Sequence, residues 1–380
     1  MTSISIIPEQ SGSDTPRPQL VISASEDDKD GHITTIAYLP DGRLVTGSWR
    51  GAVRLWNFQS GEQEGTSMKH EKEISGLAVI LDGPKIISSD IGGEIKVWDV
   101  ESHKLVKVWT HRKWIPAIAI SPDDRLIAAG GWTVGIYTTE GELANSIRVS
   151  GGYVWCLSFS PDGSKLACAI AETIHVYDVK FGTLIASADP LNGHKNVVTS
   201  VLWSHDGSKF FSASNDETVR RWDSNTGEQI GKAWTGHTSW VNSLSLSPDG
   251  TLLASSSLDK TVRFWDTIHG RPVREHVQHD TYVKSACFSP SGEFVASGDD
   301  KGNIYLWRVP RVSSIHHRVV TPFIYILALI FIVLQPIAAF PDVRRSRFCS
   351  HIPLILCVAR SRVPSWNRIC TTWLRFFVCE

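Results

Sequence analysis

The 380-residue chain lacks the cysteine spacings of metal and redox sites. Its seven cysteines form no C-x-x-C pair, so the paired thiolates of structural zinc and dithiol redox sites are missing. Cys156, Cys168 and Cys287 lie far apart, and the other four cysteines crowd the last 32 residues. The chain also lacks an N-x-S/T sequon. We therefore expect no metal and no cofactor, and a reducing, cytosolic or nuclear location for the main body.

The N-terminus lacks a secretory signal. The leader "MTSISIIPEQSGSDTPRP", residues 1–18, has neither a basic n-region nor a long apolar run. It is rich in Ser, Pro and Gly, a composition that predicts disorder.

Lysine is absent from the C-terminal 70 residues. Residues 311–380 contain nine Arg against two acidic residues, a net charge of +7, whereas the preceding 310 residues carry −8. An acidic body argues against direct nucleic-acid binding, which requires a basic surface that neutralises phosphates.

Two catalytic motifs are missing as well. The segment "GEQIGKAW" does not match the G-x-x-x-x-G-K-[ST] phosphate loop. The chain has no G-x-S-x-G nucleophile elbow, and no acid/base cluster converges in its short loops. These absences predict that the protein is not an enzyme.

What the chain does contain is a unit repeated seven times. An aromatic residue near the end of each unit recurs at steps of 39 to 45 residues, a period typical of solenoids and propellers. These aromatic residues are Trp56, Trp98, Tyr137, Tyr177, Trp222, Trp265 and Trp307.

Each unit has the pattern of antiparallel strands. About 16 residues before the aromatic lies a turn such as "SPDG", in which Pro, Asp and Gly favour tight reversal of the backbone. Alternating segments such as "VNSLSLS" and "TVRFWD" flank these turns, which indicates about four strands per unit.

The units "GHTSWVNSLSLSPDGTLLASSSLDKTVRFWD" and "GHKNVVTSVLWSHDGSKFFSASNDETVRRWD" resemble WD40 repeats, and the pattern covers residues 19–309. The resemblance implies an all-β, seven-bladed β-propeller. Physical reasoning agrees, because a four-stranded blade cannot bury both apolar faces unless it stacks against neighbours around an axis.

The last unit supplies three strands before Pro310, which cannot donate to a strand ladder. The missing outer strand is available in "QLVISA", residues 19–24. We therefore predict that this N-terminal segment pairs with the Trp307 strand and closes the ring.

Ser, His and Asp recur in the two most complete units and invite comparison with a hydrolytic triad. The resemblance instead implies a hydrogen-bonded structural brace that joins His, Ser, Asp and the indole. A triad Ser must be exposed beside an oxyanion hole, whereas these Ser residues lie within a central strand. The predicted braces are His194, Ser212, Asp216 and Trp222, and His237, Ser255, Asp259 and Trp265.

The other units match this brace less well. When the units are aligned on their turns, His32 falls in the column of Trp240, and Lys29 takes the place of the brace His. In unit 2, Gly92 occupies the Asp position, with Asp90 shifted from it, and Asp300 is shifted in unit 7. We expect blades 5 and 6 to be the best braced, and blades 1, 3 and 4 the least.

The remaining aromatic residues are candidates for function. In the family, the residue before the first strand of each blade lies on the top face, and tight turns on the same face add further side chains. Exposed Trp and Tyr are frequent hot spots of interfaces, although some could instead pack over neighbouring blades. The predicted partner-binding residues are His32, Trp49, Glu73, Trp114, Trp132, Tyr153, Trp240 and Tyr282.

These residues predict a scaffold that binds a protein or peptide. In an acidic domain, aromatic side chains would favour a basic ligand, such as a methylated lysine or an arginine held by cation–π contacts. An enzyme with an unrecognised site is the remote alternative.

The tail, residues 310–380, lies outside the repeat pattern. Residues 319–340 are uncharged and as a helix would extend roughly 33 Å, enough to span a bilayer core. Two interpretations stay open: a C-terminal membrane anchor for the propeller, or translation of a retained intron or shifted reading frame.

Overall fold

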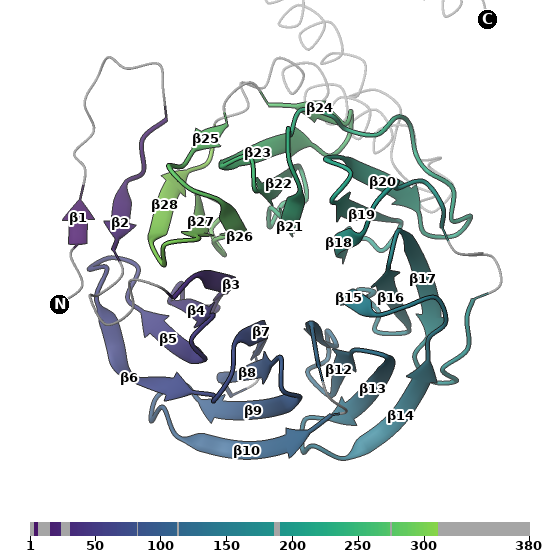
Figure 1. The fold of residues 1–380 in the computed structure, drawn as a ribbon, viewed down its shortest axis with the longest axis horizontal. Helices are drawn as coiled ribbons and strands as arrows, with labels where there is room; N and C mark the ends of the chain where they lie inside the picture. Colours follow the sequence, from purple (N-terminus) through teal and green to yellow (C-terminus); the bar gives the residue numbers. More distant parts are fainter. Residues whose placement is uncertain are drawn as a thin grey trace, which may run out of the picture. The chain divides into compact units, whose positions relative to one another are not determined.

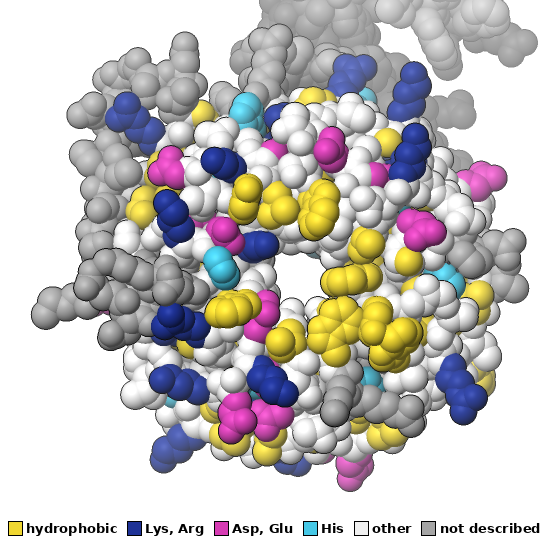
Figure 2. Space-filling view, in the orientation of Figure 1, with side chains coloured by type: hydrophobic (Ala, Val, Ile, Leu, Met, Phe, Trp, Pro, Cys, Tyr) yellow, Lys and Arg dark blue, Asp and Glu magenta, His cyan; other side chains and the backbone are white. Residues whose placement is uncertain are grey.

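The computed structural model describes residues 4–6, 16–23, 31–81, 83–111, 114–185, 191–273 and 276–310. The chain divides into two units, Met1–Val312 and Ser313–Glu380, and the described residues all belong to the first. That unit is a ring of seven antiparallel sheets around a central channel (Figures 1 and 2). The predicted seven-bladed β-propeller is confirmed.

The first three blades each have four strands, ordered as successive neighbours from the channel outward. Blade 1 comprises β3 (Ile33–Tyr38), β4 (Leu44–Ser48), β5 (Ala52–Trp56) and β6 (Gln63–Lys69). Blade 2 comprises β7 (Ile74–Ile80), β8 (Lys85–Asp90), β9 (Glu94–Asp99) and β10 (Leu105–Thr110). Blade 3 comprises β11 (Ala117–Ile120), β12 (Leu126–Gly130), β13 (Thr133–Thr138) and β14 (Leu143–Arg148).

The next two blades differ from the expected four strands, because their outer edges form only isolated bridges, such as Ile174–Leu191 in blade 4 and Val219–Trp234 in blade 5. In blade 5, Gly231 at φ 75° interrupts the extended backbone. Blade 4 comprises β15 (Val154–Phe159), β16 (Lys165–Ile170) and β17 (Thr173–Asp178). Blade 5 comprises β18 (Val198–Trp203), β19 (Lys209–Ser214) and β20 (Val219–Asp223).

The last two blades complete the ring. In blade 6 the outer edge is split into two pieces of two residues each, both paired with the third strand. Blade 6 comprises β21 (Val241–Leu246), β22 (Leu252–Ser257), β23 (Thr261–Asp266), β24 (Arg271–Pro272) and β25 (Val277–Gln278). Blade 7 comprises β26 (Val283–Phe288), β27 (Phe294–Asp299) and β28 (Ile304–Arg308), with β1 (Ile4–Ile6) and β2 (Leu20–Ile22) added at its outer edge.

The ring is closed by β2, as the sequence predicts. β2 pairs antiparallel with β28, with Leu20 opposite Leu306 and Ile22 opposite Ile304. Leu20 and Ile22 are buried in a cluster that includes Ile33 of blade 1. The closing strand therefore completes blade 7 and helps to fill the seam with blade 1.

The leader differs from its predicted disorder in one place. Ile4–Ile6 forms β1 and pairs antiparallel with the outer edge of β2. The Ile-Ser-Ile sequence has high β propensity, and the free edge of β2 provides the backbone partners that composition alone could not indicate.

The hydrophobic core lies between adjacent blades. One cluster, for example, joins Leu252 and Phe264 of blade 6 to Val283 and Phe288 of blade 7. The faces that neighbouring blades turn toward each other thus cover one another, the arrangement expected of sheets that cannot bury both faces alone.

No helix in the described parts of the chain is long and apolar enough to cross a bilayer. The predicted membrane segment 319–340 and the rest of the tail lie outside the described residues, and so does Lys29. The anchor therefore remains a prediction.

Candidate functional site on the top face

One end of the propeller collects the predicted partner-binding residues. We define the top face as the end where the innermost strand of each blade begins, and where the turns between the second and third strands also lie. Backbone hydrogen bonds join the strand starts to these turns: the Trp49 amide donates to the His32 carbonyl and the Leu258 amide donates to the Trp240 carbonyl, both at 2.9 Å.

Four aromatic side chains form one connected cluster over blades 3 and 4. The Trp114 ring lies 4.5 Å from Tyr153 and 5.3 Å from Trp155, in edge-to-face geometry, and Trp132 lies 3.8 Å from Tyr153. Trp132 is 59% exposed and Trp155 is 38% exposed. Figure 2, a view onto the top face, shows hydrophobic side chains gathered around the mouth of the channel. We call these four residues the aromatic cluster.

Trp114 adopts an unusual backbone conformation. Its φ of 65° lies in the left-handed region, which bulky side chains rarely occupy. The next residue, Ile115, is fully buried, so the core fixes the chain on that side while the ring contacts hold the indole. Such strain is found preferentially at binding and active sites.

Trp155 is a member of the cluster that the sequence prediction missed. It is the second residue of β15, and the same position in three other innermost strands holds a polar side chain that bonds to the next blade. Thr34 donates to the Ile74 carbonyl at 2.6 Å, and Asn242 donates to the Val283 carbonyl at 2.8 Å. An indole at a position of small polar residues is the sequence signal that could have identified it.

Trp240 and Tyr282 lie apart from the cluster, over blades 6 and 7. They are 49% and 46% exposed, and neither makes a ring–ring contact with another described residue. The structure thus divides the predicted aromatic set into a connected cluster and two separate side chains.

His32, Trp49 and Glu73 form a more polar part of the same face. The His32 imidazole lies 2.9 Å from the Asp300 carboxylate and 6.0 Å from the Trp49 ring. Burial raises the pKa of the Glu73 carboxyl, although Lys284, His32 and a hydrogen bond from the Trp49 indole act in the opposite direction. These residues therefore offer charged contacts across the channel mouth from the aromatic cluster.

The Ser, His and Asp residues of blade 6 form a buried relay. His237 Nδ1 donates to Asp259 at 2.7 Å, Ser255 Oγ donates to His237 Nε2 at 2.7 Å, and the Trp265 indole donates to Ser255 at 2.8 Å. Ser255 is completely buried, so no substrate can reach its hydroxyl. The geometry suits a structural brace and does not meet the requirements of a nucleophile.

Blade 5 has the same arrangement. His194 contacts Asp216 at 2.9 Å and Ser212 at 2.7 Å, and the Trp222 indole donates to Ser212 at 2.8 Å.

In blade 6, burial alone would raise the pKa of Asp259, but the hydrogen bond and charge of His237, together with the Thr261 hydroxyl, lower the pKa well below its usual range.

Blade 2 is braced as fully as blades 5 and 6, which corrects the expectation from Gly92. His70 donates to Asp90 at 3.1 Å, Ser88 bonds to His70 at 2.7 Å, and the Trp98 indole donates to Ser88 at 2.8 Å. Asp90 reaches the imidazole from the end of β8 because the amides of Gly92 and Glu94 hold its other oxygen.

The remaining blades carry partial braces. In blade 7, His279 contacts Ser297 at 3.0 Å, and the carboxylate at the end of the strand is that of Asp299, not Asp300. In blades 3 and 4, Ala129 and Cys168 occupy the register of the brace Ser. In blade 3 the Tyr137 hydroxyl instead bonds directly to His111 Nδ1 at 2.7 Å.

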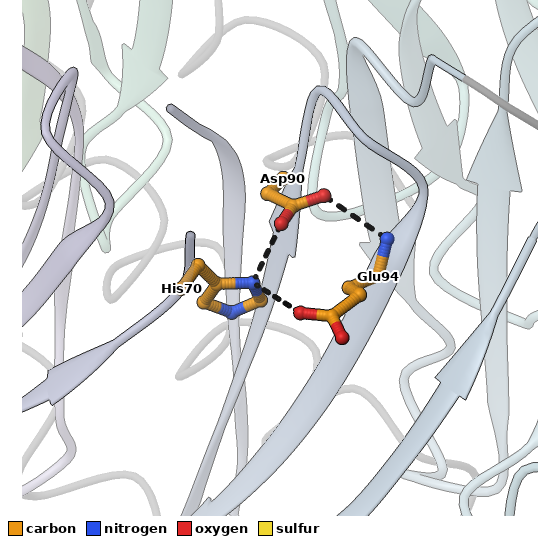
Figure 3. A group of neighbouring side chains, drawn as sticks. All are labelled: His70, Asp90 and Glu94. Carbon is orange, nitrogen blue, oxygen red and sulfur yellow. Dashed lines mark hydrogen bonds and ion pairs between the residues drawn. The ribbon is translucent and has the colours of Figure 1, made fainter. Parts of the chain in front are cut away.

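His70, Asp90 and Glu94 also form a group with metal-ligand chemistry (Figure 3). Their ligand atoms lie within 4.8 Å of one another. However, the Lys96 ammonium lies 2.9 Å from Glu94 Oε2, and Ser88 occupies the second nitrogen of His70. The group therefore already has a positive partner for Glu94, and the brace accounts for His70 and Asp90.

Comparisons with known proteins agree with this architecture. The family model "WD domain, G-beta repeat" matches residues 28–57 and 103–133, and the model "IFT122 first beta-propeller" matches residues 153–319. The matched segments include β3 to β5 of blade 1, β10 of blade 2, β11 and β12 of blade 3, and every strand from β15 to β28.

Three curated relatives illustrate the range of similar proteins. The WD repeat-containing protein SL1-17 of Schistosoma mansoni is 29% identical over 49% of this chain and 63% of its own length. The small ribosomal subunit protein RACK1y of Oryza sativa subsp. japonica is 30% identical over 37% of this chain and 44% of its own. Telomerase protein component 1 of Rattus norvegicus is 27% identical over 52% of this chain and 8% of its own length. The chain thus spans less than two thirds of each relative.

Proposed function

The chain belongs to the WD40-repeat proteins, and from that premise we propose that it is a non-catalytic scaffold that binds a protein or peptide on its top face. The observation that carries the proposal is the aromatic cluster, in which four rings make mutual contacts and two remain at least 38% exposed. Exposed, preorganised aromatic side chains lose little conformational entropy on binding and bury much area.

The partner we propose has a basic segment. Indole and phenol rings attract cations through their negative faces, and the first 310 residues carry a net charge of −8. Glu73, half-buried at the channel mouth, is available to pair with a second cationic group. Binding should therefore weaken as salt is raised from about 0.05 to about 0.5 M, because screening shortens the range of charge attraction.

A matched pair of variants tests the site. Trp132→Ala with Trp155→Ala removes the two most exposed members of the aromatic cluster. Phe181→Ala with Ile268→Ala removes two side chains that are each 68% exposed, on turns at the opposite end of the strands. Quantitative affinity capture of the tagged full chain, followed by binding measurements with the recovered partner, should show loss of about tenfold or more for the first pair only.

Both variants should remain folded, with thermal unfolding midpoints close to that of the wild type, because Trp132, Phe181 and Ile268 are more than half exposed and Trp155 is 38% exposed. Equal partner recovery with the cluster variant would place binding elsewhere on the protein.

A membrane-tethered scaffold is a second candidate, favoured by the 22 uncharged residues 319–340. In this case the propeller would face the cytosol. Mass spectrometry for the tail peptide "VPSWNR" in membrane and soluble fractions distinguishes the two: the anchor requires the peptide in the membrane fraction, and its absence argues for a chain without the tail.

A further inference from the structure

The outer strand of blade 2 has an apolar, exposed edge. β10 carries Leu105, Val106 and Val108, which are 45%, 46% and 49% exposed. Figure 1 places β10 on the outer rim between β6 and β14. An apolar edge strand is a template for pairing with another strand, and proteins normally protect such edges.

The register shows which backbone groups are free. The His111 amide donates to the Gly93 carbonyl at 2.9 Å, and Thr110 lies opposite Glu94 with Val108 opposite Lys96. The bond makes His111 and Gly93 a hydrogen-bonded pair, and bonded and non-bonded pairs alternate along an antiparallel ladder. Thr110 and Val108 therefore belong to non-bonded pairs, so their backbone N–H and C=O groups point away from β9. Among the described residues, none bonds to these outward groups.

The other outer edges are protected in different ways. In β14, the Asn145 side chain accepts from the Ser146 amide at 2.7 Å and donates to the Val179 carbonyl of blade 4 at 3.1 Å. In β6, Gly65 at φ 61° kinks the strand, and Gln63 caps the Gly65 carbonyl at 3.0 Å.

Blades 4 and 5 offer only isolated bridges at this edge, and blade 6 offers two interrupted pieces. In blade 7 the edge of β2 is covered by β1. This chain thus already uses strand addition at one outer edge. β10, which pairs regularly with β9 from Lys107 to Thr110 after a bulge between Leu105 and Lys107, is the apolar edge left uncovered within the described residues.

We propose that β10 pairs antiparallel with β10 of a second copy of this chain, so that the protein forms a weak, two-fold symmetric dimer through the rim of blade 2. An antiparallel edge is self-complementary under a two-fold axis. With the axis at Trp109, Val108 lies opposite the partner's Thr110, and the outward groups of both strands form four backbone hydrogen bonds.

Charge does not oppose this register. Lys107 lies opposite the partner's His111, and the Lys107 ammonium already bonds to the carboxylate and the carbonyl of Glu140 in its own chain. No two like-charged side chains among the described residues of β10 face each other across the axis.

The contact is small, and this sets its strength. Two six-residue edges between convex rims bury less than the roughly 1,200 Å² typical of stable interfaces. The dimer should therefore dissociate in the micromolar range and assemble where the local concentration is high. Because the rim lies outside the top face, each copy keeps its aromatic cluster free for a partner.

Sedimentation velocity of the full chain between about 5 and about 200 µM tests the proposal, since this is the range in which small interfaces associate. The dimer fraction should rise with concentration in the wild type. Val108→Lys places a charge in the edge and should lower the association constant by about tenfold or more. The matched control, Leu143→Lys, alters a residue of β14 that is 60% exposed on the protected edge and should behave as wild type.

Hydrogen exchange identifies the surface independently of folding effects. The amides of Val108 and Thr110 should exchange more slowly at high than at low concentration. A wild-type protein that stays monomeric, or a dimer in which these amides remain unprotected or which persists in Val108→Lys, overturns the proposal. None of these outcomes bears on binding at the top face, which the Trp132 and Trp155 variants test separately.

Discussion

At the scale of single residues, burial decides whether a reactive side chain can act. Ser255 has the neighbours of a nucleophile, with His237 at 2.7 Å and Asp259 beyond it, yet it is completely buried. Its hydroxyl instead joins the imidazole to the Trp265 indole, so each polar group of the relay has a partner.

Ser255→Ala should therefore reduce stability without affecting any binding at the top face. The substitution leaves His237 Nε2 and the Trp265 N–H buried without partners, which costs about 1–3 kcal/mol for each group. Urea unfolding should show a loss of about 2–6 kcal/mol in the free energy of unfolding. Ser146→Ala, at an exposed position of β14, is the control and should change stability by less than about 0.5 kcal/mol.

His279 makes stability depend on pH. Burial lowers its pKa from 6.5 to about 4, more than Asp299 and Asp280 raise it. Between these values the unfolded chain binds a proton that the folded chain does not, so the contribution of His279 to stability is greatest above pH 6.5 and falls as pH decreases toward 4. The full loss is roughly 3 kcal/mol.

His279→Gln should flatten this slope, because glutamine does not titrate. The measurement is the free energy of unfolding of both proteins at several pH values between about 7 and about 4. Ser146→Ala, a change at an exposed residue that does not titrate, should keep the wild-type slope. A slope that His279→Gln leaves unchanged would assign the acid sensitivity to other groups.

At the scale of strands and turns, the sequence predicted what depends on local pattern. Period-2 alternation and Pro-Asp-Gly turns are properties of short segments, and they identified the innermost strands of the blades correctly. The outer strands were harder to predict. They are half-exposed, so their pattern is weak, and in blades 4 and 5 they form only bridges.

The candidate site was predicted in part for the same reason. Position within the repeat placed Trp114, Trp132 and Tyr153 on one face, but which rings touch depends on how neighbouring blades approach each other. Asp90 shows that sequence spacing alone does not identify a brace residue: it is two residues from the expected position, yet its carboxylate lies 3.1 Å from the His70 imidazole. Trp155 was missed because the prediction covered only the residue before each first strand and the tight turns, whereas Trp155 is the second residue of β15.

At the scale of the whole molecule, stability depends on how the ring is closed. The first and last blades are joined by β2, whose partner β28 lies more than 280 residues later in the sequence. Without β2, the edge of β28 loses its backbone partners, and the cluster that contains Leu20, Ile22 and Ile33 opens to water. A propeller with an open seam loses the mutual support of all its blades, because each blade buries its faces against its neighbours.

Deleting residues 1–24 should therefore lower the unfolding midpoint sharply. Leu20 and Ile22 are 6% and 3% exposed, and loss of two such side chains removes about 4–6 kcal/mol even before the ladder is counted. For a domain of this size, that corresponds to a decrease of about 10 °C or more in differential scanning calorimetry. Deleting residues 1–10 removes β1 but keeps β2, so it should have a much smaller effect.

Adding a peptide of residues 16–24 to the protein that lacks residues 1–24 should restore part of the lost stability in a concentration-dependent way, since a ligand that binds the folded state raises the unfolding midpoint. An unchanged midpoint after the longer deletion would show that blades 1 and 7 hold the seam without the strand.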